Sequence, residues 1–194
     1  MTTTLTRESV LVAAREMIRD GGLEGLSLRR LAANLGVTAP ALYAHIGSKR
    51  DLLQGVAEAE FAEMLARFRE VSGPDPIERL RGLSRAYIDY ARENPFLFRT
   101  MFLFRPELTA SPRDDEPASA TGVFRFAAAP IEEAIESGVI LRSDPLLTAL
   151  TLWTAIHGLA TVILAGPDFG PGTEADLAES VIDTVLAGLQ TRAT

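Results

Sequence analysis

The sequence contains no cysteine, which excludes disulfide bonds and zinc sites built on thiolates. Only two histidines occur, His45 and His157, so a histidine-rich metal site is not expected and no cofactor is predicted. Strand signals are also scarce, because no alternating run of β-branched residues is bounded by a hairpin turn such as Asn-Gly. These absences predict an all-α protein of a reducing, cytoplasmic compartment.

Membrane segments are also lacking by sequence criteria. The stretch from Leu146 to Gly166 comes closest to the roughly 20 apolar residues that span a bilayer. Its threonines, its histidine and the Asp144-Pro145 cap before it favour a buried helix instead. The first residues carry charges through their apolar stretch, unlike a signal peptide. We therefore expect no membrane contact.

Positive charge is concentrated at one end of an otherwise acidic chain. The whole chain has a formal net charge of −7, whereas residues 1–50 hold seven Lys and Arg against four Asp and Glu, a net +3. A basic end on an acidic body can approach phosphates while the body is repelled, which orients the molecule on DNA. The asymmetry favours a nucleic-acid contact in residues 1–50.

Helix caps and helical periodicity predict about nine helices in two parts. Residues 1–50 are expected to form a three-helix helix-turn-helix domain, and residues 51–194 a helical bundle joined to it by a linking helix across 48–71. The first three helices are expected from Thr6 to about Asp20, from Leu28 to Leu35 after the cap Ser27, and from Ala39 to about Ile46 after the cap Thr38. Later helices are expected after Asp75, after Asn94-Pro95, and near 118–137, 145–165 and 174–190.

The two short helices joined through Gly36-Val37 have the spacing of a helix-turn-helix. The second of them spans about 12 Å, at roughly 1.5 Å per residue, which suits the major groove of B-DNA. The small core that sets the angle between the two helices is expected to consist of Leu31, Ala32, Leu35, Val37 and Leu42. The pattern predicts a regulator that binds double-stranded DNA.

The stretch GVTAPALYAHIGSKRDLL, residues 36–53, resembles the most diagnostic part of TetR/AcrR-type repressors. The likeness covers roughly residues 7–55. It implies that DNA is contacted by Ser27, Arg29, Thr38, Ala39, Pro40, Ala41, Tyr43, His45 and Lys49. Alternatives remain open: Tyr43 and His45 could be packing residues, and Lys49 could be merely solvated. Since the second helix has few hydrogen-bonding side chains, DNA shape should contribute to recognition.

The stretch from Trp153 to Gly158 resembles the Trp-x-x-x-His-Gly element of one C-terminal domain type in the same family. Trp153 and His157 share one helical face, where they could pack in the core or line an effector cavity. Other aromatic side chains present the same two alternatives, and a cavity of this kind would suit a hydrophobic small-molecule effector. The candidate ligand residues are Tyr87, Tyr90, Phe98, Met101, Phe102, Phe124, Trp153 and His157.

The resemblance also implies a homodimer formed through the helices near 145–165 and 174–190. Their apolar surfaces support this, because they need cover on more than one side. We expect a repressor released from a pseudo-palindromic operator by a small effector. One alternative is an effector-independent architectural DNA-binding protein. A helical-bundle enzyme using His157 is a remote alternative, because no catalytic motif accompanies that histidine, so no enzyme is predicted.

Overall fold

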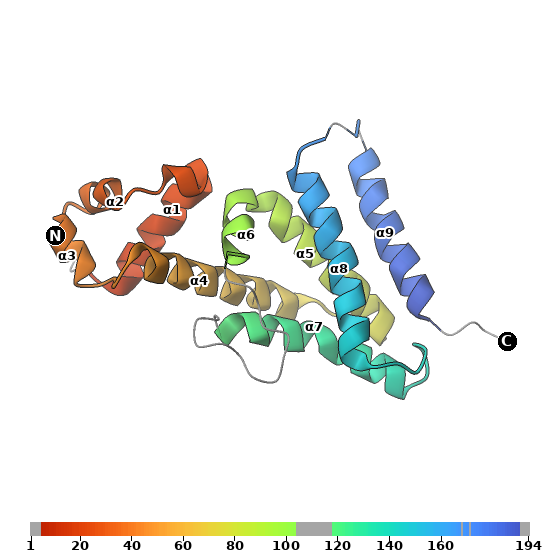
Figure 1. Cartoon of the computed structure of the whole chain (residues 1–194). Helices are drawn as coiled ribbons and strands as arrows, with labels where there is room; N and C mark the ends of the chain where they lie inside the picture. The colour runs from red at the N-terminus through yellow and green to blue at the C-terminus, as the bar shows by residue number, and fades with distance from the viewer. Residues whose placement is uncertain (1–4, 104–117, 168, 171, 191–194) are drawn as a thin grey trace. The chain divides into compact units, whose positions relative to one another are not determined.

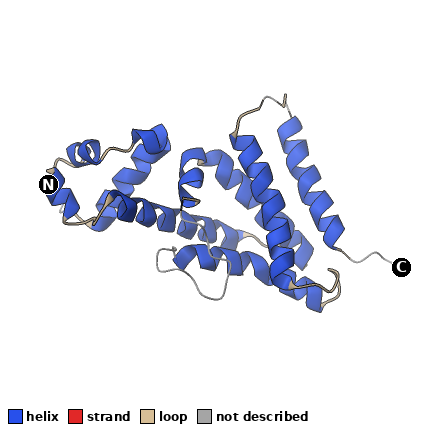
Figure 2. Ribbon diagram, viewed as in Figure 1, coloured by secondary structure: helices blue, strands red, loops and turns tan. Residues whose placement is uncertain are grey.

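The computed structural model describes residues 5–103, 118–167, 169–170 and 172–190, and almost all of them lie in helices or short connections (Figures 1 and 2). Within these ranges there are nine helices, which confirms the predicted all-α fold. The described part has one isolated β-bridge, between Ile140 and Gln190, and no longer strand. The helices are α1 (Arg7–Gly25), α2 (Leu28–Asn34), α3 (Ala39–Tyr43), α4 (Lys49–Glu70), α5 (Pro76–Glu93), α6 (Pro95–Met101), α7 (Ala118–Glu136), α8 (Pro145–Leu164) and α9 (Thr173–Leu189).

Side-chain caps fix several helix starts where the sequence predicts them. Thr6 and Ser9 form a reciprocal capping box at the start of α1. The Thr38 hydroxyl accepts the backbone N–H three residues further on, at the start of α3. The Asp144 carboxylate does the same at the start of α8. Each cap gives a partner to a backbone donor that the helix itself leaves unsatisfied.

Two details at the ends of α1 and α2 differ from the sequence-based prediction. Helix α1 is bounded at Gly25 rather than near Asp20, but it consists of two helical segments that meet at a kink at Gly22, where φ is 65° and ψ is −169°, so the first segment ends at Gly21-Gly22 as predicted. Glycine adopts this positive φ without the steric penalty of a Cβ, so the chain can change direction there. Ser27 precedes α2 as expected, but its side chain makes no capping hydrogen bond.

Helix α3 is shorter than predicted and ends at Tyr43 instead of near Ile46. The turn after it remains tied to the helix, because the backbone N–H groups of His45 and Ile46 both donate to the carbonyl of Leu42. Leu42 and Ile46 are fully buried. This turn therefore continues the packed face of α3 although it is not helical.

The first compact unit comprises Met1–Glu63 and Asn94–Thr121. Its core joins the helix-turn-helix to α6, because Leu97 of α6 is fully buried in the same cluster. Burying a leucine side chain contributes about 1.5–3 kcal/mol to folding. The cluster consists of Val10, Ala14, Ile18, Leu26, Leu31, Ala32, Leu42, Ile46, Leu52, Val56 and Leu97, with Leu35 and Val37 partly buried against it.

The second compact unit comprises Met64–Glu93 and Gly122–Thr194. In it α5, α8 and α9 pack together. Helix α9 buries only Ile182 and Leu186 completely. Ion pairs add to this contact and join α9 to α5: Arg92 with Glu174, Arg85 and Arg81 with Glu179, and Arg81 with Asp183.

Helix α8 is long and apolar enough to cross a membrane by length and composition alone. A core helix of a protein that never meets a membrane satisfies the same criterion. In the second unit α8 packs against both α5 and α9 and buries six of its residues, among them Leu152, Ile156 and Leu159. Leu146, Leu147 and Val162 remain exposed, so one side of α8 is apolar and uncovered in the single chain.

Candidate functional site

Helix α3 presents a surface made of small apolar side chains and one aromatic ring. Its fully buried residue, Leu42, belongs to the core of the first unit. The predicted DNA-contacting residues of α3 and its N-cap are all exposed or partly exposed: Thr38, Ala39, Pro40, Ala41 and Tyr43. These side chains offer van der Waals contact, for instance to thymine methyl groups, and few hydrogen bonds to base edges.

Tyr43 and His45 differ in exposure. The Tyr43 side chain is 51% exposed, so its ring is not packed away against the helix that follows. His45 is half-buried, and its backbone carbonyl accepts a hydrogen bond from Arg7 at 3.2 Å. The Tyr43 phenol is therefore open to solvent, whereas the main chain of His45 is engaged within the protein.

Two cationic side chains outside α3, Lys49 of α4 and Arg30 of α2, bind the end of α1. The Lys49 ammonium donates to the carbonyl of Leu26 at 3.1 Å, and Arg30 donates to the carbonyl of Gly25 at 3.3 Å. Gly25 ends α1 and Leu26 is the extended residue that follows it, so both cations give hydrogen-bond partners to carbonyls at the C-terminal end of the helix. Lys49, predicted to bind phosphate, is thus bonded within the chain, although an ammonium has three donors.

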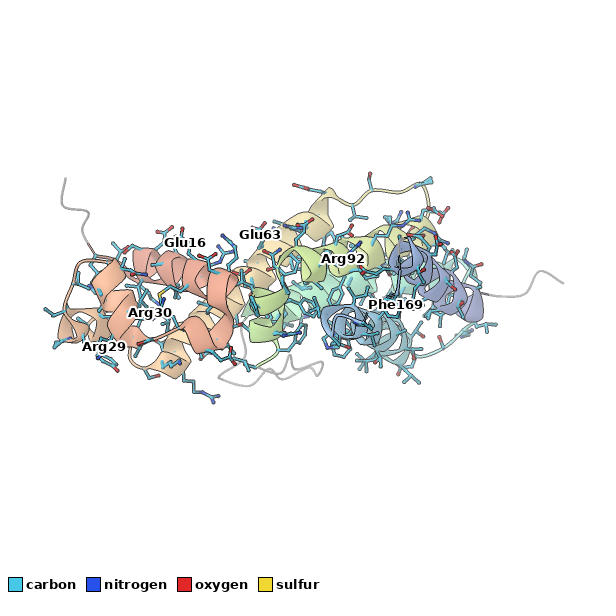
Figure 3. All side chains as sticks on the ribbon, turned by 90° about the horizontal axis from the view of Figure 1, so that it is seen from above. Glu16, Arg29, Arg30, Glu63, Arg92 and Phe169 are labelled. Carbon is cyan, nitrogen blue, oxygen red and sulfur yellow. The ribbon has the colours of Figure 1, made fainter. Side chains whose placement is uncertain are left out.

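The remaining predicted DNA contacts lie at the start of α2. Arg29 is exposed and Ser27 is half-buried. Figure 3 labels Arg29 beside Arg30 on this helix. The positive charge near α3 is carried by these two arginines on α2 and by Lys49 at the start of α4.

Sequence reasoning missed a pair of charged residues beside α3, Arg7 and Asp51. Two guanidinium nitrogens of Arg7 donate to the two carboxylate oxygens of Asp51, at 2.8 and 2.9 Å. The hydrogen bonds from Arg7 lower the pKa of Asp51, and the same pairing raises the pKa of Arg7. The partners are 44 residues apart, so no local pattern points to the pair.

Tyr87, Trp153 and His157 lie together in the second unit. The Tyr87 hydroxyl is 2.7 Å from Nδ1 of His157, and the Trp153 ring stacks on the imidazole with centroids 5.1 Å apart. Burial raises the pKa of Tyr87 and lowers the pKa of His157. A phenol that keeps its proton and a neutral imidazole can share this hydrogen bond, and the imidazole tautomer decides which of the two groups donates.

The other candidate ligand residues do not form one group with these three within a single unit. Tyr90 and Phe124 lie in the second unit, where Tyr90 is fully buried and Arg67 lies over its ring at 5.0 Å. Phe98, Met101 and Phe102 belong to the first unit, where Phe102 contacts both Phe98 and Phe61. Among the described residues, no group of three or more His, Asp or Glu side chains could hold a metal ion.

The helix-turn-helix with an exposed second helix, carried on an all-helical chain, defines a DNA-binding transcriptional regulator. Two family models match: residues 10–56 match the model of bacterial regulatory proteins of the tetR family, and residues 80–187 match a tetracycline repressor-like C-terminal domain. The chain belongs to the TetR family. This family consists of transcriptional regulators, so the protein is not an enzyme. The specific Trp-x-x-x-His-Gly type of the C-terminal domain stays a prediction.

Similar proteins agree with this assignment. The chain is 26% identical to the HTH-type transcriptional regulator Rv0681 of Mycobacterium tuberculosis over 98% of its own length and 84% of that protein. It is 36% identical to the class D tetracycline repressor of Escherichia coli over 51% of its length, but this match spans only 40% of that repressor. A protein of unknown function from Rhodococcus sp. RHA1 has the same fold, with a TM-score of 0.83, 23% identity and 97% coverage of both chains.

Proposed function

We propose that this regulator is a homodimeric repressor that leaves a pseudo-palindromic operator when a small hydrophobic effector binds. The observation that carries the proposal is the exposed face of α3, mounted through Leu42 on a well-packed core. Residues 1–50 bind the operator and residues 51–194 bind the effector and form the dimer, in the cytoplasm. The name of the tetracycline repressors that it matches supports repression.

DNA recognition combines weak base contacts with stronger contacts to the phosphates. The small side chains of α3 approach the floor of the major groove closely, while Tyr43, Arg29 and Lys49 contact the backbone on its rim. The Lys49 ammonium has three donors, so it can bind a phosphate either while it keeps its hydrogen bond to the Leu26 carbonyl or in place of that bond. Sequence preference then depends on thymine methyl groups and on DNA shape.

The chain itself connects the effector residues with the DNA-binding core. Helix α5 carries Tyr87, which binds His157 of α8. Only Asn94 separates α5 from α6, whose Leu97 is fully buried in the core of the helix-turn-helix unit. An effector that favours another arrangement of Tyr87 and His157 therefore acts on α5, and the next helix along the chain, α6, belongs to the DNA-binding core. Such an effector shifts the population of the DNA-binding state only by its difference in affinity between the two states.

Exposed faces of α8 and α9 form the proposed dimer contact. Helix α8 exposes Leu147, which is 64% accessible, together with Val162. Helix α9 is attached by one face and exposes the other, including Ser180 and Thr184. A two-fold dimer buries such a face against its own copy and presents two α3 helices to related half-sites.

An electrophoretic mobility shift with the DNA upstream of the gene for this chain tests the proposal. We expect a discrete complex that persists against unrelated competitor DNA and weakens steeply as salt rises, because phosphate contacts release counterions. Absence of a specific complex on any palindrome in that region would contradict the proposal.

A further inference from the structure

The guanidinium of Arg7, at the start of α1, also binds the turn that follows α3. Besides its two bonds to Asp51, it donates to the carbonyl of His45 at 3.2 Å. Oδ2 of Asp51 in turn accepts the backbone N–H of Gly47 at 3.0 Å. One side-chain pair thus joins α1, the turn between α3 and α4, and the first turn of α4.

We propose that Arg7 and Asp51 are positioning residues for DNA recognition, because their pair holds the turn after α3, and through it α3 itself, against α1. The inference rests on the proposed DNA contact of α3. We call this pair the Arg7–Asp51 brace. It acts through α3 and does not itself contact DNA.

Helix α3 needs such support because it is short. It has five residues, whereas an isolated helix of fewer than about 12 residues is marginal in water. Its orientation therefore depends on what holds its two ends. The Thr38 hydroxyl caps the first end, and buried Leu42 and Ile46 anchor one face. The Arg7–Asp51 brace holds the backbone at the second end through His45 and Gly47.

Close helix packing fixes the position of the brace. At Gly55 of α4, an added Cβ would lie 2.8 Å from Cδ2 of Leu11 and 3.4 Å from Nη2 of Arg7. Glycine at this position lets the side chains of α1 lie directly against the α4 backbone. The brace therefore joins two helices whose separation is already small and fixed.

The brace contributes more to the orientation of α3 than to the free energy of unfolding. The Arg7 and Asp51 side chains are 46% and 38% exposed, and exposed ion pairs contribute little to the free energy of unfolding. A two-pronged arginine–carboxylate contact nevertheless fixes both distance and angle. Another ion pair between α1 and α4, Arg15 with Glu60, has a carboxylate that is almost fully buried, and loss of Arg15 would destabilise the fold. Loss of the brace should instead appear in DNA affinity.

A direct phosphate contact by Arg7 is the rival explanation, and charge distinguishes the two. If Arg7 bound phosphate, Asp51 would compete for it, so Asp51→Asn would leave DNA binding unchanged or make it tighter. If the brace positions α3, Asp51→Asn and Arg7→Gln should both weaken DNA binding, since each removes the same contact.

The test measures fluorescence anisotropy of a labelled duplex from the upstream region, titrated with the full chain over a range of salt concentrations. Arg7→Gln and Asp51→Asn should each weaken binding about tenfold, the value of a charged hydrogen-bond contact. The double variant should bind no more weakly than the weaker single variant, because both changes remove one interaction. The salt dependence should keep its slope. Arg7→Lys should also bind DNA more weakly, because lysine keeps the positive charge but cannot form the two-pronged contact with Asp51.

Arg85→Gln is the matched control. Arg85 makes a two-pronged bond to Glu179, at 2.7 and 2.6 Å, between half-exposed side chains of the second unit. This variant should bind DNA like the wild type. Wild-type affinity in Arg7→Gln would overturn the proposal. Tighter binding of Asp51→Asn, with a salt slope reduced by about one in Arg7→Gln, would overturn it in favour of a phosphate contact.

A second measurement without DNA separates failure of the brace from failure of the operator proposal. Hydrogen exchange of the backbone across residues 44–48 should be faster in Asp51→Asn, whose neutral amide oxygen is a weaker acceptor for the Gly47 N–H and no longer forms an ion pair with Arg7, at an unchanged melting temperature. Unchanged exchange there would overturn the brace. If the wild-type chain bound no specific DNA while this exchange increased, the operator proposal would fail and the structural role of the brace would stand.

Discussion

Tyr87 links two helices of the second unit through a single buried hydroxyl. Tyr87→Phe removes its hydrogen bond to His157 and leaves the ring in place, so we expect the free energy of unfolding to fall by about 1 kcal/mol. Urea denaturation measures this change. Tyr43→Phe removes a hydroxyl from an exposed tyrosine and should leave the free energy of unfolding unchanged. Equal effects of the two substitutions would argue against a specific Tyr87–His157 contact.

We expect His157 to make the free energy of unfolding depend on pH. Burial lowers its pKa below the ordinary value of 6.5, so the unfolded chain takes up this proton at a higher pH than the folded chain. The free energy of unfolding should therefore fall as the pH decreases from about 6.5 toward the lowered pKa of the folded state. Urea denaturation at several pH values checks this. His157→Gln should remove this part of the slope and His45→Gln should retain it; the reverse pattern would refute the assignment.

Helix α6 belongs to the DNA-binding unit by packing although it lies far from α1–α3 in sequence. Leu97→Ala leaves a cavity in that core and should cost about 2–5 kcal/mol of stability, with weaker DNA binding. Thermal denaturation and a DNA titration measure the two effects. Leu103→Ala, at a 51% exposed site just after α6, should change stability by less than about 0.5 kcal/mol. A Leu97→Ala chain as stable as the wild type would show that the helix-turn-helix unit does not depend on the packing of α6.

The elements that the sequence predicted well are those set by local signals. The caps Thr6, Thr38 and Asp144 act within three residues, and their helices start where expected. The joining of α6 to the first core could not be predicted, because Leu97 has the local pattern of any buried leucine. The candidate site divides in the same way: exposure on α3 follows from periodicity, whereas the Arg7–Asp51 contact depends on how α1 crosses α4.

Dimer formation is a property of the whole molecule that one substitution can test. Leu147→Glu places a charge in the exposed apolar face of α8 and should convert the dimer to a monomer at micromolar concentration, as measured by analytical ultracentrifugation. DNA affinity should fall with it, because one half-site is lost. Val12→Glu changes a similarly exposed residue of α1 and should remain dimeric. A dimeric Leu147→Glu chain would place the interface elsewhere.

The central claim is that the exposed face of α3 binds an operator. A titration of the upstream duplex with the wild-type chain and with Tyr43→Ala, at two salt concentrations, tests it most directly. We predict specific, salt-sensitive binding by the wild-type chain and at least about tenfold weaker binding by Tyr43→Ala, with an unchanged melting temperature. Equal affinity of the two proteins for the duplex, or equal affinity of the wild type for a scrambled duplex, would contradict the account.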